Sequence, residues 1–150
     1  MNALSKSEFR PYTPADQSAC LALFDANCPE YFAPNERDDY VEFLGAKPSG
    51  YEVCELDGEI VGGFGVIPGR DNKVDLRWIL LNPNSQGRGL GSAIMSRVIA
   101  VASGQGAVAV DIGASHKSAP FFARFGAQAT GEIENGWGPG MHRIDMVLTL

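Results

Sequence analysis

Residues 80–92, LLNPNSQGRGLGS, carry most of the information about the fold. An apolar run ends at Asn82-Pro83, and because proline cannot donate a hydrogen bond to a sheet, a strand is expected to stop there. The glycine-rich turn at residues 86–91 leads into a helix with apolar residues at three- and four-residue spacing. The main-chain N–H groups of such a turn, at the positive end of a helix, form an anion site suited to phosphate. Arg88 is a candidate for a charge-assisted contact to that phosphate.

Strands and helices flank this turn in a regular order. Before it, the sequence predicts a strand at 9–12, a helix with Thr13 as N-cap candidate that begins at Pro14 and stops before Pro29, a helix at 36–44, and strands at 51–56, 59–66 and 73–81. After it, the sequence predicts a helix at 90–103, a strand at 107–112, a helix at 118–125, and strands at 128–132 and 141–150 around the loop ENGWGPG. This order predicts a single α/β domain over residues 1–150, with a mixed sheet that is antiparallel in its N-terminal half and has a parallel crossover after Lys73.

Composition excludes several classes of protein. The 150 residues fit one domain, and 12 Lys plus Arg against 18 Asp plus Glu give a net charge of −6, so the basic footprint of a nucleic-acid binder is missing. Cys20, Cys28 and Cys54 contain no CxxC pair, which argues against a disulfide framework and a metal site and favours a reducing, cytoplasmic compartment. No apolar run approaches the roughly 18 residues of a membrane span, and the N-terminus lacks the apolar segment of a signal peptide.

Two familiar phosphate-binding motifs fail at the glycine-rich turn. A Walker loop needs GxxxxGK[ST], and the turn has neither the lysine nor the spacing. A dinucleotide fingerprint needs GxGxxG/A, but its last position would be Ser92 when counted from Gly87 and Ile94 when counted from Gly89. The turn therefore favours a different phosphate-bearing ligand.

The spacing Gln86-x-x-Gly89-x-Gly91 resembles the Q/R-x-x-G-x-G/A signature of the GNAT superfamily, the acetyl-CoA-dependent N-acetyltransferases. The context strengthens the resemblance: an apolar strand precedes the motif, an amphipathic helix follows it, and the later segment SAPFFARFGA is similar to the family's closing helix and turn. The resemblance extends from Phe9 to Leu150. It implies helices on both faces of the sheet and a central pair of parallel strands splayed around the cofactor.

The resemblance implies that acetyl-CoA is the co-substrate and that no metal is needed. Its pyrophosphate would lie on the turn at 86–91, and its pantetheine arm would lie where the two central parallel strands separate. An amine would attack the thioester directly, while a carboxylate or water takes its proton and main-chain N–H polarises the acetyl carbonyl. The residues implied in cofactor binding are Ile79, Leu80, Leu81, Gln86, Gly87, Arg88, Gly89, Leu90, Gly91, Ser92, Ser118, Phe121 and Phe122.

Three side chains are candidates for proton transfer. Asp75 occupies the strand position where some family members have a glutamate base, although it could equally pair with Arg77 or Lys73. His116 and His142 are the only histidines, and imidazole titrates near neutral pH, although each could instead be an exposed or hydrogen-bonded structural histidine. Phe122 departs from the family, which often has a tyrosine here to protonate the leaving thiolate.

The acceptor side is less well defined by the sequence. Tyr31, Phe32 and Trp137 are candidates for an aromatic wall around the substrate. The acidic run Glu36, Asp38 and Asp39 could attract an amine, but acidic residues favour the start of a helix, so we expect a solvated helix start.

The sequence thus predicts a cytoplasmic N-acetyltransferase that moves an acetyl group from acetyl-CoA to a primary amine on a small molecule, peptide or protein. Homodimers are common in the family that it resembles. One alternative is a non-catalytic acyl-CoA-binding sensor or regulatory module, which would bind CoA without turnover. The other is a nucleotide-binding α/β domain, which would bind ATP or NAD instead.

Overall fold

The computed structural model describes residues 7–85 and 89–150. The element order is the one predicted from the sequence. It runs β1 (Ser7–Pro11), α1 (Gln17–Ala26), α2 (Glu36–Gly45), β2 (Tyr51–Leu56), β3 (Glu59–Pro68), β4 (Lys73–Leu81), α3 (Leu90–Gly104), β5 (Ala109–Ser115), α4 (Ala119–Ala123), β6 (Gln128–Gly138) and β7 (Met141–Thr149). Short 3-10 turns at Pro14–Asp16 and Pro83–Ser85 lead toward α1 and α3.

A seven-stranded sheet in the order β1-β2-β3-β4-β5-β7-β6 forms the centre of the molecule. β4 and β5 pair in parallel, and the other neighbouring strands pair antiparallel. The predicted mixed sheet, with its antiparallel N-terminal half and central parallel pair, is confirmed. The Asp57-Gly58 turn between β2 and β3 has φ of 55° and 83°, the left-handed conformation that a tight two-residue hairpin needs.

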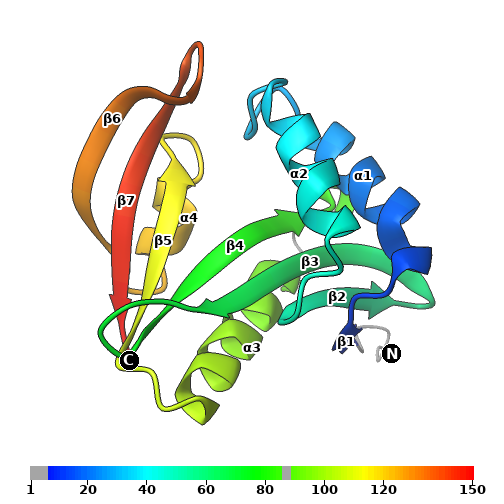
Figure 1. Ribbon diagram of the computed structural model, residues 1–150, viewed down its shortest axis with the longest axis horizontal. Coiled ribbons are helices and arrows are strands. Elements are labelled where there is room, and N and C mark those ends of the chain that lie inside the picture. The colour runs from blue at the N-terminus through cyan, green and yellow to red at the C-terminus, as the bar shows by residue number, and fades with distance from the viewer. Residues whose placement is uncertain (1–6, 86–88) are drawn as a thin grey trace.

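The sheet separates two different cores. Helix α3 lies on one side, and α1 and α2 lie on the other, as Figure 1 shows. The α3 side is filled largely by aliphatic residues, among them Val74, Ile94 and Val110. The side of α1 and α2 is largely aromatic, with Phe24, Tyr40, Tyr51 and Trp78 packed together.

A β-bulge interrupts β4 at Trp78. Arg77 pairs with Gly65 and Leu80 pairs with Gly63, so two residues of β4 lie opposite one residue of β3. Trp78 has a φ of 49°, which is uncommon for a bulky residue outside a bulge or turn. The extra residue redirects the side chains: Val74 and Leu76 pack on the α3 side before the bulge, whereas Trp78 and Leu80 pack on the α1–α2 side after it.

The parallel pair separates just before the bulge. The register between β4 and β5 runs from Lys73–Ala109 to Leu76–Ile112, and beyond it the two strands continue without pairing to each other. Figure 1 shows the result as a V between β2–β4 and β5–β7. The predicted splay of the central strands is therefore present.

Several sequence-based boundaries differ from the structure, and the differences at β5 and β6 bear on the site. β5 was predicted at 107–112 but runs from Ala109 to Ser115, because its last residues pair with β7. The segment ENGWGPG was predicted as a loop, but β6 extends to Gly138, which pairs with Met141. The glycines of this segment are typical of a loop. It extends β6 because it lies beside β7, a partner that the local sequence does not reveal.

Within the described residues, no helix is long and apolar enough to cross a membrane.

Candidate active site

A cavity of about 1450 Å³ lies where β4 and β5 separate. Its walls come from the segment between α1 and α2, from β4, β5 and β7, and from the beginnings of α3 and α4. It is lined by every candidate cofactor and acceptor residue that the structure describes, together with Asp75: Tyr31, Phe32, Asp75, Ile79, Leu80, Leu81, Gly89, Leu90, Gly91, Ser92, Ser118, Phe121, Phe122 and Trp137. Gln86, Gly87 and Arg88 lie outside the described residues.

The start of α3 leaves main-chain donors available to a ligand. Gly89 is the N-cap with a φ of 75°, and no side chain of the described residues caps the helix. The first intrahelical bond runs from the N–H of Ala93 to the carbonyl of Gly89 at 3.0 Å, so the N–H groups of Leu90, Gly91 and Ser92 precede the helical ladder. Uncapped N–H groups at the positive end of a 15-residue helix favour an anion such as a pyrophosphate.

Helix α4 packs closely against this helix start. A Cβ on Gly91 would lie 2.7 Å from Cε1 of Phe121, so only glycine allows the two elements to approach this far. Phe122 is 3% exposed and belongs to the α3-side core, whereas Phe121 is half-buried and lines the cavity. The hydroxyl of Ser118 accepts the N–H of Ser115 at 3.0 Å, which fixes the turn between β5 and α4.

A chain of hydroxyl groups holds the bulged peptide of β4. The hydroxyl of Tyr51 donates to the carbonyl of Trp78 at 2.7 Å, and it lies 2.7 Å from the hydroxyl of Tyr40. Because a trans peptide is planar, the N–H of Ile79 points away from Tyr51. β3 and β5 flank β4 on opposite sides, so this N–H points toward the side on which β4 and β5 separate.

Two glycines of β3 make room for Tyr51. Its ring crosses β3 from β2, and a Cβ on Gly63 or on Gly65 would lie 3.0 Å from an atom of that side chain. Glycine in a strand often marks such a close approach. The glycines of β3 thus allow Tyr51 to reach the bulged peptide of β4.

The opposite wall of the cavity carries charged residues. Asp75 and Arg77 precede the bulge on β4 and lie 3.6 Å apart, which agrees with the structural alternative for Asp75. The Asp75 side chain is 35% exposed and lines the cavity. On β7, Arg143 and Asp145 form a closer pair at 2.7 Å.

Trp137 joins the β6–β7 hairpin to two other parts of the molecule. Its ring N–H donates to the carbonyl of Ala114 on β5 at 2.9 Å, and the guanidinium of Arg143 lies 5.0 Å from its ring centroid. Its carbonyl accepts the side-chain amide N–H of Asn35, which precedes α2, at 2.9 Å. This last bond connects the hairpin with the α1–α2 segment.

Glu36 is the residue that sequence analysis placed wrongly. We expected it on a solvated helix start, but it is 6% exposed, whereas Asp38 and Asp39 are exposed as predicted. It lines the cavity beside Phe32, whose ring stacks on Trp78 with 6.1 Å between centroids. Burial raises the pKa of Glu36 to about 7. The acidic run contained the residue, but the position of α2 against β4 decided its burial.

His116 and His142 lie against each other, away from the lining of the cavity. Their ring centroids are 4.7 Å apart, and the Nδ1 atom of each accepts a main-chain N–H, from His142 and Asn135 respectively. The structure therefore does not bring these two histidines together with Asp75. Among the residues that the structure describes, no cluster of three or more His, Cys, Asp or Glu is arranged to hold a metal ion.

The structure is thus an α/β protein in which a helix start suited to phosphate lies beside two separating parallel strands. The sequence matches the acetyltransferase (GNAT) family over residues 20–127. An uncharacterized N-acetyltransferase of Mycobacterium bovis is 31% identical over 134 residues, which cover 79% of this chain and 86% of that protein. The chain belongs to the GNAT acetyltransferase family.

Solved structures of this family share the fold. Ard1 from Thermoplasma volcanium superimposes with a TM-score of 0.79 at 15% identity, over 96% of this chain and 98% of that one. The yncA protein of Salmonella typhimurium, solved with its cofactor acetyl-CoA, gives a TM-score of 0.73 at 19% identity, over 97% and 94% of the two chains. At these identities the likeness concerns the fold.

Proposed function

We propose that this protein transfers an acetyl group from acetyl-CoA directly to a primary amine. The observation that carries the proposal is the cavity between β4 and β5, because one cavity joins a helix start suited to pyrophosphate with an acidic and aromatic wall suited to an amine. Direct transfer needs both reactants in one space, since the amine nitrogen must reach the thioester carbon.

The described residues fit the cofactor. The main-chain N–H groups of Leu90, Gly91 and Ser92 would hold the pyrophosphate, and Phe121, Ile79 and Leu81 would line the pantetheine arm. When bound, acetyl-CoA supplies an acetyl group activated as a thioester. The cofactor-bound structure of the yncA protein supports this assignment, since the fold is shared.

The bulge of β4 contributes the polarising group. The N–H of Ile79 points toward the side where the strands separate, and the hydrogen bond from Tyr51 to the Trp78 carbonyl fixes the orientation of that peptide. A fixed main-chain donor stabilises negative charge that develops on a carbonyl oxygen during attack. Tyr51 is therefore a positioning residue for this donor.

The catalytic side chains stay predictions. Asp75 is a candidate base that lines the cavity, with the guanidinium of Arg77 3.6 Å from its carboxylate. His116 and His142 would need to act through intervening groups, because neither lines the cavity. Phe122 is buried and carries no hydroxyl, so we propose that the leaving thiolate takes its proton from water or from the acceptor.

Thermal unfolding with acetyl-CoA, ATP and NAD side by side tests the proposal. A ligand at about 100 times its dissociation constant stabilises the folded state by roughly 2.7 kcal/mol, which raises the midpoint by roughly 5–11 °C for a domain of this size. We expect a shift with acetyl-CoA, followed by amine-dependent thiol release. A shift without turnover on any amine would favour a non-catalytic acyl-CoA-binding module. A shift with ATP or NAD alone would overturn the cofactor assignment.

Two further predictions concern the setting in which the protein works. We propose a cytoplasmic location, in agreement with three cysteines that are free in the structure. We also propose a homodimer. Light scattering of the purified chain tests the second point directly.

A further inference from the structure

Glu36 is a buried carboxylate on the wall of the cavity. It is the first residue of α2 and is 6% exposed. One of its oxygens, Oε2, accepts the main-chain N–H of Ala33 at 2.8 Å. Within residues 7–85 and 89–150, the carboxylate forms no ion pair with a cationic side chain.

The surroundings disfavour a charged carboxylate. Phe32 and Trp78, which stack on each other, line the same cavity. Burying a carboxylate in such a place without a cation is costly, and burial raises the pKa of Glu36 to about 7. A side chain in this state is stabilised when a cation enters the cavity, and it can hold a proton at neutral pH.

We propose that Glu36 receives the ammonium group of the acceptor and takes its proton. The inference rests on the acetyl transfer proposed above and adds the residue that prepares the amine for attack. An ammonium ion has no free electron pair, so it must lose a proton before its nitrogen can act as a nucleophile. The ligand class is a primary ammonium compound, which is stable in water as the cation.

The protons balance over one turnover. Of the three ammonium protons, one goes to Glu36, one ends on the sulfur of CoA and one stays on the amide nitrogen. The new N–C bond forms as the C–S bond of the thioester breaks. Glu36 then returns its proton to the solvent, which restores the carboxylate for the next acceptor.

Other titratable groups lie on the helix of Glu36 or line the same cavity. Asp39 on α2 raises the pKa of Glu36 further. Burial, then the charge of Asp25 and then that of Glu36 raise the pKa of the Cys28 thiol. Arg37 is held by Asp25 of α1 at 2.9 Å. The remaining charged and titratable groups lie elsewhere on the cavity wall: Tyr31, Asp75, Arg77, Asp111, Lys117, Arg124, Arg143 and Asp145.

Asp75 differs from Glu36 in the property that a base requires. It has Arg77 within 3.6 Å and is 35% exposed, so its charge is already compensated by a cation and by water. A compensated carboxylate gains less from binding an ammonium group or accepting its proton. Removing Glu36 should therefore change the pH dependence of acetyl transfer, whereas removing Asp75 should not.

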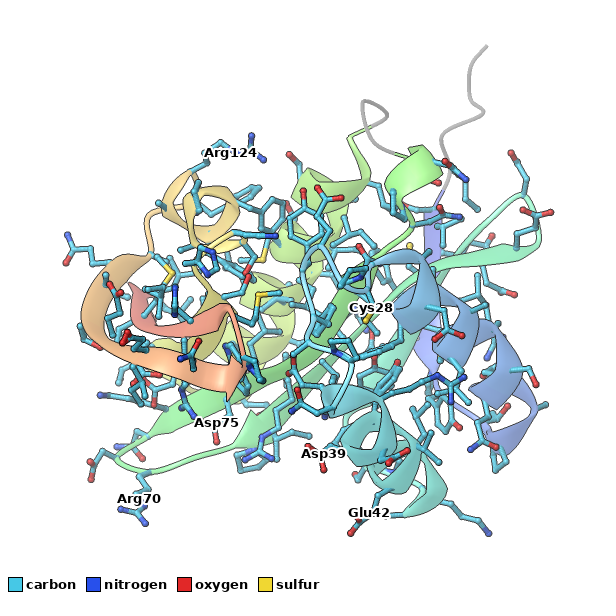
Figure 2. The ribbon with its side chains drawn as sticks, turned by 90° about the horizontal axis from the view of Figure 1, so that it is seen from above. Cys28, Asp39, Glu42, Arg70, Asp75 and Arg124 are labelled. Atoms are coloured by element: carbon cyan, nitrogen blue, oxygen red, sulfur yellow. The ribbon has the colours of Figure 1, made fainter. Side chains whose placement is uncertain are left out.

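The test compares three variants with the unmodified protein: Glu36→Gln, Asp75→Asn and Glu42→Gln. Glutamine keeps an oxygen that can accept the Ala33 N–H, so Glu36→Gln removes the base and retains the structural bond. Glu42 lies on the same helix and points away from the rest of the molecule, as Figure 2 shows, which makes Glu42→Gln the matched control. Thiol release is measured from pH 5.5 to 9 with phenethylamine, n-hexylamine and spermidine as probes.

We expect kcat of the unmodified protein to rise with pH through about 7, where Glu36 becomes ionised. Glu36→Gln should lower kcat by roughly a hundredfold and remove that rise. Glu42→Gln should stay within about twofold of the unmodified protein, and Asp75→Asn should keep the rise near pH 7. Unchanged kcat and pH dependence in Glu36→Gln would overturn the inference and leave Glu36 a structural residue.

A measurement without turnover separates this inference from the proposed function. If acetyl-CoA binds but no probe is acetylated, the transfer reaction is wrong for these amines. The carboxyl carbon of Glu36 is then followed by NMR in protein labelled at glutamate, with the Glu36→Gln spectrum to assign it. A titration near pH 7 that moves when phenethylamine is added supports the ammonium site. A titration near 4.5 without such a response overturns it.

Discussion

The two walls of the cavity differ in the groups that form them: one is formed by main chain and the other by side chains. The wall at the start of α3 uses main chain: Gly89 in a left-handed conformation, Gly91 closely approached by Phe121, and N–H groups that no side chain in the described part of the chain caps. The other wall uses side chains from separate segments, with Glu36 from α2, Asp75 and Trp78 from β4 and Arg143 from β7. A main-chain site needs a short glycine pattern, whereas a side-chain site needs distant residues to meet. The sequence therefore defines the first wall, whereas it offers only candidate residues for the second.

The largest effect is expected in the pH dependence of stability, which tests whether the side-chain wall holds a buried carboxylate. The pKa of Glu36 is raised to about 7 by burial, against 4.5 for the free side chain. The folded state therefore binds more protons between these values, so the unfavourable contribution of Glu36 is absent below pH 4.5 and complete above pH 7. As the pH rises from 4.5 to 8, the free energy of unfolding of Glu36→Gln should increase by about 3 kcal/mol relative to that of the unmodified protein.

Denaturant unfolding of both proteins across this pH range measures the difference. Glu42→Gln serves as the control, because Glu42 is exposed and its loss should leave the pH dependence nearly unchanged. A pH-independent difference between Glu36→Gln and the unmodified protein would show that the carboxylate is solvated and that the two walls do not differ in this respect.

The main-chain wall can be broken with Gly89→Val. A Cβ at Gly89 meets no atom of the described residues within 4 Å, so the substitution extends into the space beside the helix start where the pyrophosphate would approach. The dissociation constant for acetyl-CoA should rise roughly tenfold to a hundredfold, since a hydrogen bond to a charged group is worth about 1.5–3 kcal/mol. Calorimetric titration with acetyl-CoA measures it.

Gly106→Val separates this effect from backbone strain. Gly106 has a φ of 77° against 75° for Gly89, and its Cβ also meets open space, but it follows the far end of α3. Both variants should lose similar stability, about 1–2 kcal/mol, because valine is strained at positive φ. Equal acetyl-CoA affinities in the two variants would remove the helix start from the cofactor site.

Tyr51→Phe tests the hydrogen bond that orients the Trp78–Ile79 peptide in the cavity. The change deprives the Trp78 carbonyl and the Tyr40 hydroxyl of a buried partner, so unfolding should require about 1–3 kcal/mol less free energy. The peptide that carries the Ile79 N–H is then less firmly oriented, and kcat should fall while acetyl-CoA affinity is kept. In Tyr12→Phe, at a half-buried ring packed on Tyr51, kcat should be unchanged. Equal kcat values in the Tyr51 and Tyr12 variants would deny Tyr51 its positioning role.

The smallest effect is expected for Asn35→Ala. This exposed side chain joins the α1–α2 segment to the β6–β7 hairpin through one hydrogen bond to the Trp137 carbonyl, worth about 0.5–1.5 kcal/mol. KM for the amine should rise a few-fold, with no change in acetyl-CoA affinity, because only the side-chain wall is affected. Steady-state kinetics with each reactant varied in turn measures both. A change in acetyl-CoA affinity alone would place this bond on the other wall.

Much of the fold could be predicted because its signals are local. Pro83 ends a strand, Asp57-Gly58 forms a two-residue turn, and glycines mark the start and the end of α3. Each of these residues restricts its own backbone, so a single sequence is enough to place it. The predicted order of strands and helices then restricts the sheet to a few possible strand orders.

The bulge of β4 and the extent of β6 could not be predicted in the same way. Nothing in the run RWILL indicates that Trp78 adopts a φ of 49°, because this conformation is imposed by pairing with β3 and by the hydrogen bond from Tyr51. Residues 133–138 contain the glycines of a loop, yet they belong to β6, which pairs with β7 at Ile133 and Gly138 and is irregular between them. In both places the deciding partner is distant in the chain.

The sequence by itself determined the class of site: a glycine turn at a helix start needs only its own residues to present main-chain donors. It also determined the element order and the family resemblance. Only the tertiary structure decided the state of the acceptor wall. Packing of α2 against the sheet removed the Glu36 carboxylate from water, whereas Asp75 kept both its solvent and its arginine. Burial and ion pairing depend on what surrounds a side chain, and those surroundings exist only once distant segments have folded together.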